Sequence, residues 1–361
     1  MTNPTSNGLE GVVVADTAIS EVDGERGRLV IAGHDVEQLA LHSTFEDAVS
    51  AVLTAGGARL ADPPRLGAAR AAAFELVPRL GDALAMPDGM DALRTAVGHL
   101  RPTGDDLADA IAAIGAAPVF VAGWNRTCGG LAPIAPDPTL PHAEDYLRMS
   151  IGAAPSPAAA KALDAYLVTV IDHGMSASTF SARVITSTAS DLISAIVGGV
   201  GALKGPLHGG APGPVLDMLD AIGSPEAAEP WLLAELAAGR RIMGMGHRIY
   251  RVRDPRAAVL ETAVRPLASR RLELARAVES AASKILRERK PDRPMAANVE
   301  FYTAVLLDAV GLPREQFAPT FAVSRIAGWS AHVIEQRRTG RLIRPASRYV
   351  GLSASTGQYR Q

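Results

Sequence analysis

The stretch RIMGMGHRIYRVRDPR, residues 241–256, gathers five arginines and one histidine among two glycines and a proline. The chain as a whole does not explain this charge, because 36 Lys+Arg against 38 Asp+Glu leave a formal net charge of -2. That balance argues against a nucleic-acid-binding protein. A basic cluster in a nearly neutral protein favours one small anionic ligand held at one site. The alternative is a solvated basic turn without a ligand.

Three histidines, His173, His208 and His247, each lie beside a glycine where we expect a helix end or a loop. An imidazole in such a place can face a cleft and take part in chemistry near neutral pH. For each histidine taken alone, a purely structural role is the alternative. We expect no metal, because no two of the three have helical i,i+4 spacing and the sequence contains no CxxC pair.

His208 and Glu300 are predicted to lie near helix N-termini, where the helix dipole acts on both. We place His208 at or just before the helix that follows HGGAPG, where the dipole disfavours its protonation. A neutral histidine is a suitable hydrogen-bond donor to a developing enolate oxygen. Glu300 in NVEFY follows Asn298 and belongs to the first helical turn, which favours its carboxylate form. An ordinary helix start explains Glu300 equally well.

Arg256, Arg325 and Arg344 lie in three different segments. An arginine on an apolar helix is costly unless its guanidinium is paired, most simply with a carboxylate. A bound ligand or an internal salt bridge would satisfy each one. Spacing along the sequence does not show whether these arginines converge with the histidines, so both interpretations stay open.

Length and composition predict a mainly α-helical protein with two domains. A chain of 361 residues exceeds the size of one hydrophobic core, so we expect a large domain, a small domain and a cleft between them. Alanine-rich stretches with few β-branched runs favour helix. Residues 11–33 indicate a short β-hairpin or extended arm. The longest apolar stretch, residues 110–124, is too short to span a membrane, so we expect no membrane partner and a cytoplasmic location.

Several helices show recognisable ends in the sequence. Ser43 and Glu46 predict a capping box at the start of one helix. A second helix is predicted to start at SPAAAK and to end at the glycine of DHG, over residues 156–174, which places His173 at its C-terminus. A long helix is predicted over residues 319–340.

Six segments resemble the citrate synthase family, of the short dimeric type, in their order and spacing. They are DHGMSASTFSARVITSTASDLISAI, GALKGPLHGGA, GMGHRIYRVRDPRA, NVEFYTAVLL, FAVSRIAGWSAHVIEQ and RLIRP. With the weaker matches ISEVDGERGRL and MDALRTAV, the resemblance runs from about residue 19 to the end of the chain. GPLHGG and GHRIYRVRDPR are far more specific than a short glycine motif.

The resemblance implies an almost wholly helical homodimer that condenses acetyl-CoA with oxaloacetate. Residues 1–220, completed by residues 329–361, would form the large domain, and residues 221–328 would form a small domain that closes over the active site. No cofactor is implied, because the coenzyme A thioester is itself a substrate. The other partner implied is a second copy of this chain, and nucleic acid and membrane are not expected.

The same resemblance assigns roles to individual residues. The catalytic residues would be His208 at the enol oxygen, His247 at the ketone, and Glu300 as the base. Oxaloacetate would be bound by His173, His247, Arg256, Arg325 and, from the other subunit, Arg344. Coenzyme A would be bound by Met243, Gly244, Met245, Gly246, Arg248, Arg251, Arg253, Lys290 and Arg293.

The chain departs from the family pattern at several places. Family members usually have aspartate in NVDFY, where this chain has Glu300, whose side chain is one methylene longer. Gly174 stands in place of the glutamate of DHE, Ser176 replaces a common asparagine, and Pro212 stands in place of the asparagine of HGGAN. DGMD replaces HPMD.

Two other functions stay open from the sequence. The first is 2-methylcitrate synthase, which uses propionyl-CoA with the same machinery. One methylene in an apolar pocket changes selectivity by only about 1–3 kcal/mol, and the sequence does not locate the pocket walls. The second is a non-catalytic homologue that binds coenzyme A or a dicarboxylate, an interpretation motivated by the departures around His173 and at Glu300.

Overall fold

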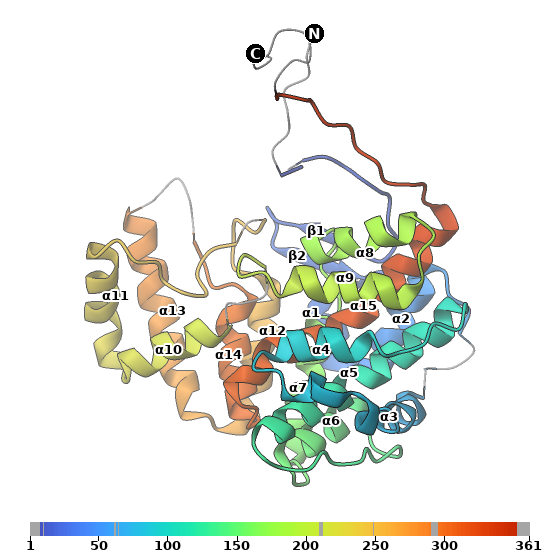
Figure 1. The fold of residues 1–361 in the computed structure, drawn as a ribbon. Helices are drawn as coiled ribbons and strands as arrows, with labels where there is room; N and C mark the ends of the chain where they lie inside the picture. The colour runs from blue at the N-terminus through green and yellow to red at the C-terminus, as the bar shows by residue number, and fades with distance from the viewer. Residues whose placement is uncertain are drawn as a thin grey trace.

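The computed structural model describes residues 8–9, 11–60, 63, 65–208, 212–247, 249–289 and 295–351. The fold is mainly helical, as the composition predicts, with one small three-stranded sheet near the N-terminus. Figure 1 shows a large body of helices with a smaller group of helices on its left.

The predicted hairpin within residues 11–33 is present. Strand β1 (Ser20–Asp23) pairs antiparallel with β2 (Arg28–Ile31), which pairs in turn with β3 (His34–Asp35). Leu29 and Ile31 on β2 are buried, so one face of the sheet joins the core. Residues 11–19, before β1, form an irregular arm. Figure 1 shows that arm and residues 340–351 leaving the body on the same side.

The large body surrounds α15, the predicted long helix, which runs from Phe317 to Thr339 and is buried along most of its length. It packs against α2, α4, α5, α8 and α9. The helices of the body are α1 (Val36–His42), α2 (Phe45–Gly56), α3 (Leu66–Phe74), α4 (Gly89–Val97), α5 (Asp106–Cys128), α6 (His142–Ile151), α7 (Pro157–Thr169), α8 (Ala177–Ser187), α9 (Leu192–Leu203) and α15.

Helix α5 is the only helix among the described residues with the length and hydropathy to cross a membrane. Its most apolar window is 78% buried inside the protein. It packs against α3, α4, α6 and α15 as a central core helix.

The smaller group consists of α10 (Pro212–Ile222), α11 (Ala228–Ala237), α12 (Pro255–Val264), α13 (Arg270–Arg289) and α14 (Val299–Ala309). Helix α10 packs mainly against α13 and α14, whereas α12 packs against α14 on one side and against α1 and α7 of the body on the other. Helix α10 thus packs with the smaller group and α15 mainly with the body, and the expected division at residues 221–328 stays a prediction. Single 3-10 turns are η1 (Val77–Arg79), η2 (Gly81–Ala85), η3 (Pro225–Ala227), η4 (Arg265–Leu267) and η5 (Arg314–Gln316).

Two helix ends differ from the sequence predictions. The capping box at α2 is formed by Thr44 and Asp47, one residue later than predicted, because Ser43 already terminates α1 through its N–H bond to Leu39. Helix α7 starts at Pro157 as predicted but ends at Thr169, five residues before Gly174. The segment that follows α7 is therefore a turn.

Candidate active site

The turn after α7 carries His173 and is fixed from both sides. Arg325 on α15 donates from Nε to the Val170 carbonyl at 2.8 Å. This hydrogen bond holds the backbone in place where α7 ends. The Asp172 carboxylate then accepts the Gly174 N–H at 3.0 Å. His173 is buried between these anchors, and its Nε2 lies 3.1 Å from the Tyr250 hydroxyl.

The glycine-rich loop before His247 is joined to the start of α14. Gly246 donates its N–H to the Ala296 carbonyl at 2.7 Å, and the Gly244 carbonyl accepts the Asn298 N–H at 2.9 Å. Gly244 has φ +71°, and a Cβ there would lie 2.9 Å from the Phe301 ring, so only glycine allows this close approach. Because Asn298 also caps α14, the loop is bonded directly to the first turn of that helix.

His173, His247 and Tyr250 form one cluster of rings. The centroids of the two imidazoles are 5.5 Å apart, and the Tyr250 ring lies 4.7 Å from the His247 ring. The Arg256 guanidinium lies 5.9 Å from the Tyr250 ring centroid. Sequence reasoning missed Tyr250, although a hydroxyl-bearing aromatic residue between His247 and the arginines of GHRIYRVRDPR is a usable signal.

Arg256 is held at the start of α12 by its neighbour Asp254. The Asp254 carboxylate caps the helix and accepts from Arg256 Nε at 3.0 Å and from Nη2 at 2.7 Å. Burial and the positive charge of Arg256 hold the pKa of His173 well below its usual range and lower the pKa of His247 to about 4. Both histidines are therefore neutral near pH 7.

The hydrogen bonds of His247 assign its tautomer. Its Nδ1 accepts the backbone N–H groups of Ile249 at 3.0 Å and Tyr250 at 3.1 Å. A nitrogen that accepts N–H bonds carries no proton, so the proton of neutral His247 resides on Nε2. The ring thus offers a neutral N–H donor.

His208 has the opposite tautomer. Its Nε2 accepts the Ser178 N–H at 3.3 Å and lies 2.8 Å from the Ser178 hydroxyl. That hydroxyl in turn accepts from Trp329 Nε1 at 3.2 Å. The proton of neutral His208 therefore resides on Nδ1. The pKa of His208 is lowered, as expected, but the causes are burial and the charge of Arg325. A helix dipole is not needed to explain it.

Glu300 and Arg325 each carry a buried polar atom without a hydrogen-bond partner among the described residues. Glu300 lies in the first turn of α14, as predicted, and burial raises its pKa to about 7, against the opposing charges of Arg256 and Arg325. Its Oε2 and the Nη2 of Arg325 are both buried without a hydrogen-bond partner among the described residues. Burial lowers the pKa of Arg325 to about 10, so the group is still a cation at neutral pH. Buried polar atoms of this kind are usually completed by a protein group, an ordered water or a bound ion or ligand.

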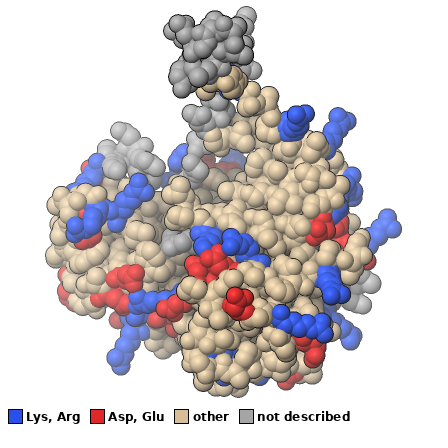
Figure 2. Space-filling model, viewed as in Figure 1, with Lys and Arg blue, Asp and Glu red and all other residues tan. Residues whose placement is uncertain are grey.

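The structure thus brings most of the predicted catalytic and oxaloacetate residues into one electrostatic cluster. The charges of Arg256 and Arg325 act on Glu300 and His173, and the charge of Arg325 acts on His208. The cluster draws on the turn after α7, the segment before α10, the 243–250 loop, and helices α12, α14 and α15. Figure 2 shows the surface hollowed between the body and the smaller group of helices.

Arg344 does not join this cluster within the single chain. It is an exposed residue of the C-terminal segment. It lines a cavity of about 840 Å³ between that segment and the N-terminal arm.

The residues predicted to bind coenzyme A have mixed outcomes. Arg253 is engaged elsewhere, since Glu279 accepts from its Nε at 2.7 Å and Glu261 from its Nη2 at 2.9 Å. These two carboxylates neutralise Arg253, which argues against a role at a phosphate. Arg251 is exposed and lies 4.0 Å from Glu25. Three further residues, Arg248, Lys290 and Arg293, lie outside the described residues.

The loop predicted to approach adenine, Met243 to Gly246, has only part of its backbone available. The Gly246 N–H and carbonyl and the Gly244 carbonyl bond to residues 296–298. Met245 forms an isolated bridge with Ala297 and is half-buried, as is Met243. The loop's adenine contact stays a prediction.

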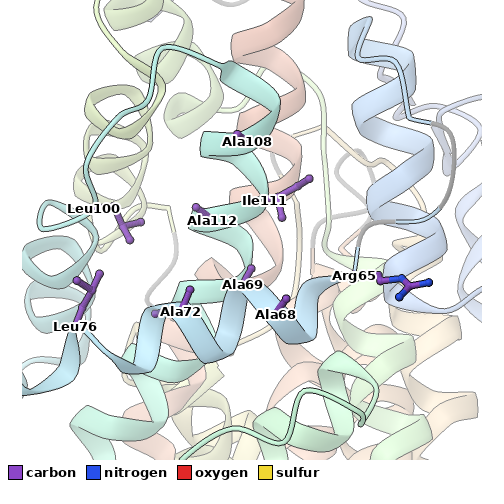
Figure 3. A pocket seen from close by; sticks show the side chains of 10 residues that line it. Arg65, Ala68, Ala69, Ala72, Leu76, Leu100, Ala108, Ile111 and Ala112 are labelled. Atoms are coloured by element: carbon purple, nitrogen blue, oxygen red, sulfur yellow. The ribbon is translucent and has the colours of Figure 1, made fainter.

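A second cavity, of about 490 Å³, lies away from these residues between α3 and α5 (Figure 3). Its walls are mainly alanine and leucine side chains, and Figure 3 shows Arg65 pointing away from them at one end. It offers no group for acid, base or nucleophilic chemistry.

The chain is similar to known proteins over almost its whole length. A family model described as "Citrate synthase, C-terminal domain" matches residues 8–346. The chain is 38% identical to a citrate synthase of Deinococcus radiodurans, over 96% of each chain, and 36% identical to a 2-methylcitrate synthase of Mycobacterium tuberculosis, over 97% of this chain and 93% of that one. Among solved structures, it is similar to the ternary complex of carboxymethyl coenzyme A and oxaloacetate with citrate synthase from Thermoplasma acidophilum. The TM-score is 0.87 at 27% identity, over 98% of both chains.

Proposed function

This chain belongs to the citrate synthase family, and from that premise we propose that its cleft condenses acetyl-CoA with oxaloacetate to give citrate and free coenzyme A. One observation carries the proposal. A carboxyl with a pKa near 7, Glu300, and an unpaired guanidinium nitrogen, on Arg325, face one cluster that also holds two neutral histidines of known tautomer. A proton acceptor, an anion site and two aimed N–H donors are the groups that this condensation needs.

The first step removes a proton from the methyl group of acetyl-CoA. Glu300 in its ionised form accepts that proton, and its pKa of about 7 makes it a stronger base than an ordinary carboxylate while it is still half-ionised at neutral pH. The thioester oxygen gains charge as the enol forms. The Nδ1–H of His208 stabilises that oxygen, because a neutral imidazole donates a hydrogen bond without giving up its proton readily.

The second step forms the carbon–carbon bond. The enol carbon attacks the ketone carbon of oxaloacetate, and the Nε2–H of His247 donates to the ketone oxygen as it becomes an alkoxide. His173, Arg256 and Arg325 hold the carboxylates. Water then cleaves the thioester of citryl-CoA, which releases citrate and the coenzyme A thiol. Closure of the cleft would exclude water until this last step.

We propose that the active unit is a homodimer in which Arg344 of the partner subunit completes the oxaloacetate site. In the single chain, Arg344 is exposed on an arm. Apolar side chains on the two arms are also exposed, with Val13 at 84% and Leu342 at 59%, and burial in a partner would stabilise them. Figure 2 shows that the surface over α8 and α9 carries few charged side chains, which suits a subunit contact. We further expect a cytoplasmic location and a role in the tricarboxylic acid cycle.

Release of free thiol from the purified protein tests this function. Acetyl-CoA and propionyl-CoA, each with oxaloacetate, should both be assayed with a thiol reagent, and kcat/KM for acetyl-CoA should be the larger. A clear preference for propionyl-CoA would instead establish the 2-methylcitrate reaction. Binding of both substrates by calorimetry without thiol release would establish the non-catalytic alternative.

A further inference from the structure

A line of buried polar side chains runs from the His173 turn to the base of the C-terminal arm. We call it the polar relay, and it consists of Asp172, His332, Arg183, Glu335 and Gln336. Asp172 Oδ1 lies 3.3 Å from His332 Nε2, a charge contact in which neither atom has a hydrogen-bond partner among the described residues. His332 Nδ1 lies 2.8 Å from Arg183 Nη1. Arg183 then donates from Nη1 to Glu335 Oε2 at 2.7 Å and from Nε to Gln336 Oε1 at 3.2 Å.

The relay costs free energy to bury, because every member is at most 4% exposed and three of its five side chains are formally charged. Its α15 members repeat at helical spacing with Arg325, so one stripe of this core helix is polar instead of apolar. Gly328 lies on the same stripe, and a Cβ there would be 2.3 Å from the Ile171 carbonyl oxygen. The helix is thus seated directly against the His173 turn.

The hydrogen bonds within the relay fix the state of His332. Arginine only donates, so His332 Nδ1 must accept from Arg183, and the ring proton must reside on Nε2, facing Asp172. The Arg183–His332 contact therefore has one direction, with Arg183 as the donor.

The two ends of the relay hold functional segments. At one end, Asp172 Oδ2 accepts from the Ser20 hydroxyl and from the Gly174 N–H, which brackets His173. At the other end, Glu335 Oε1 accepts the Ala18 N–H of the N-terminal arm at 2.8 Å. Gln336 Nε2 donates to the Arg341 carbonyl at 3.1 Å, three residues before Arg344. Figure 1 shows both arms leaving the body beside the C-terminal end of α15.

We propose that the polar relay positions two oxaloacetate-binding residues at once: His173 in its own subunit and, through the arm, Arg344 for the partner subunit. Its members are positioning residues that act through the His173 turn and the arm. This inference rests on the proposed function, because it assumes that His173 and Arg344 bind oxaloacetate.

A second buried arginine provides a matched control. Arg70 on α3 is 0% exposed, donates from Nε to Asp145 at 2.7 Å and lies 3.3 Å from His142 Nδ1. It has the same partner types as Arg183, an acid and a histidine nitrogen, but in a part of the body that does not touch the site. Arg183→Lys and Arg70→Lys should therefore lose similar stability.

The experiment compares these two variants as full-length protein with wild type. Thermal unfolding should show a similar drop in Tm for both. Only Arg183→Lys should raise the KM for oxaloacetate, and its Kd in calorimetry, by roughly tenfold, with the KM for acetyl-CoA little changed. Equal oxaloacetate values for the two variants would overturn the proposal.

Milder variants keep the test decisive if Arg183→Lys does not fold. Ser20→Ala weakens only the His173 end, and Gln336→Leu releases only the arm end. Each should raise the oxaloacetate KM about threefold or more. In an Arg344→Ala background, Ser20→Ala should retain its effect on the Kd for oxaloacetate, whereas Gln336→Leu should lose it. Equal behaviour of the two in that background would refute the relay.

Wild-type protein that releases no thiol would contradict the proposed function, and the calorimetric comparison would still test the relay.

Discussion

Removing the carboxyl of Glu300 tests the catalytic assignment, because the pKa of about 7 gives the group a measurable pH signature. An acid whose pKa is raised is protonated below that pKa, and a protonated carboxyl does not accept a proton from acetyl-CoA. By simple titration about one tenth of Glu300 is ionised at pH 6 and about nine tenths at pH 8. The kcat/KM of the wild type should therefore rise roughly tenfold between these values.

The rise of kcat/KM between pH 6 and pH 8 is the acid limb of the pH profile. The titrations of the other groups in the cluster should not obscure it. The pKa of His247 is lowered to about 4, so that ring is neutral from pH 6 to pH 8. Burial and the charge of Arg325 lower the pKa of His208 as well, which moves its titration toward more acidic pH. The pKa of Arg325 is about 10, so loss of its charge produces a fall in kcat/KM only on the alkaline side. The expected profile is a bell with an acid limb near 7.

Glu300→Gln keeps the size of the side chain and removes the base. It should lower kcat by about 10²–10⁴-fold and flatten the acid limb. Glu300→Asp keeps the acid but draws it back by one methylene, and a displacement of about 1 Å costs on the order of a hundredfold in rate. Both are measured by thiol release, with Glu226→Gln, an exposed carboxyl at η3, as the control. A flat wild-type profile from pH 6 to pH 8, or a Gln variant with near wild-type kcat, would refute the assignment.

His208→Ala should lower kcat far more than it raises the KM for oxaloacetate in the thiol assay, because His208 acts on the enol; the reverse pattern would give it a binding role. Arg344→Ala should inactivate the enzyme, and mixing it with His208→Ala subunits should restore part of the activity, since one site in the mixed dimer has both residues. Lack of restoration argues against a shared site. Gly328→Ala should lower stability by about 1–3 kcal/mol in thermal unfolding, because its Cβ would lie 2.3 Å from the Ile171 carbonyl oxygen; an unchanged Tm would contradict this close packing.

Much of the fold was predictable because local rules set it. The hairpin within residues 11–33, the start of α7 at Pro157 and the long α15 each follow from turn residues, caps or apolar spacing. The end of α7 was not predictable in this way. The periodicity continues past Thr169, but a distant arginine on α15 captures the Val170 carbonyl, and that contact is invisible in the local sequence.

The electrostatics of the cluster were only partly predictable. A neutral His208 was expected from a helix dipole, yet burial and a charge more than a hundred residues away account for its lowered pKa. The tautomers depend on which backbone N–H groups reach each ring, which spacing does not encode. Tyr250 was overlooked because its importance comes from contacts with His173 and His247 on separate segments.

For the buried arginines, the sequence alone does not predict which group pairs with each guanidinium. A guanidinium on an apolar helix must be paired, but the partner can be an internal acid or an absent ligand. Arg70, Arg183 and Arg256 each have a carboxylate of this chain within 2.7 Å. Arg325 lies 4.6 Å from the Phe321 ring centroid, and its Nη2 is buried without a hydrogen-bond partner in the part of the chain that the structure describes. Since a buried donor of a cation that lacks a hydrogen-bond partner lowers stability, a bound dicarboxylate such as oxaloacetate should stabilise the protein in part through this nitrogen of Arg325.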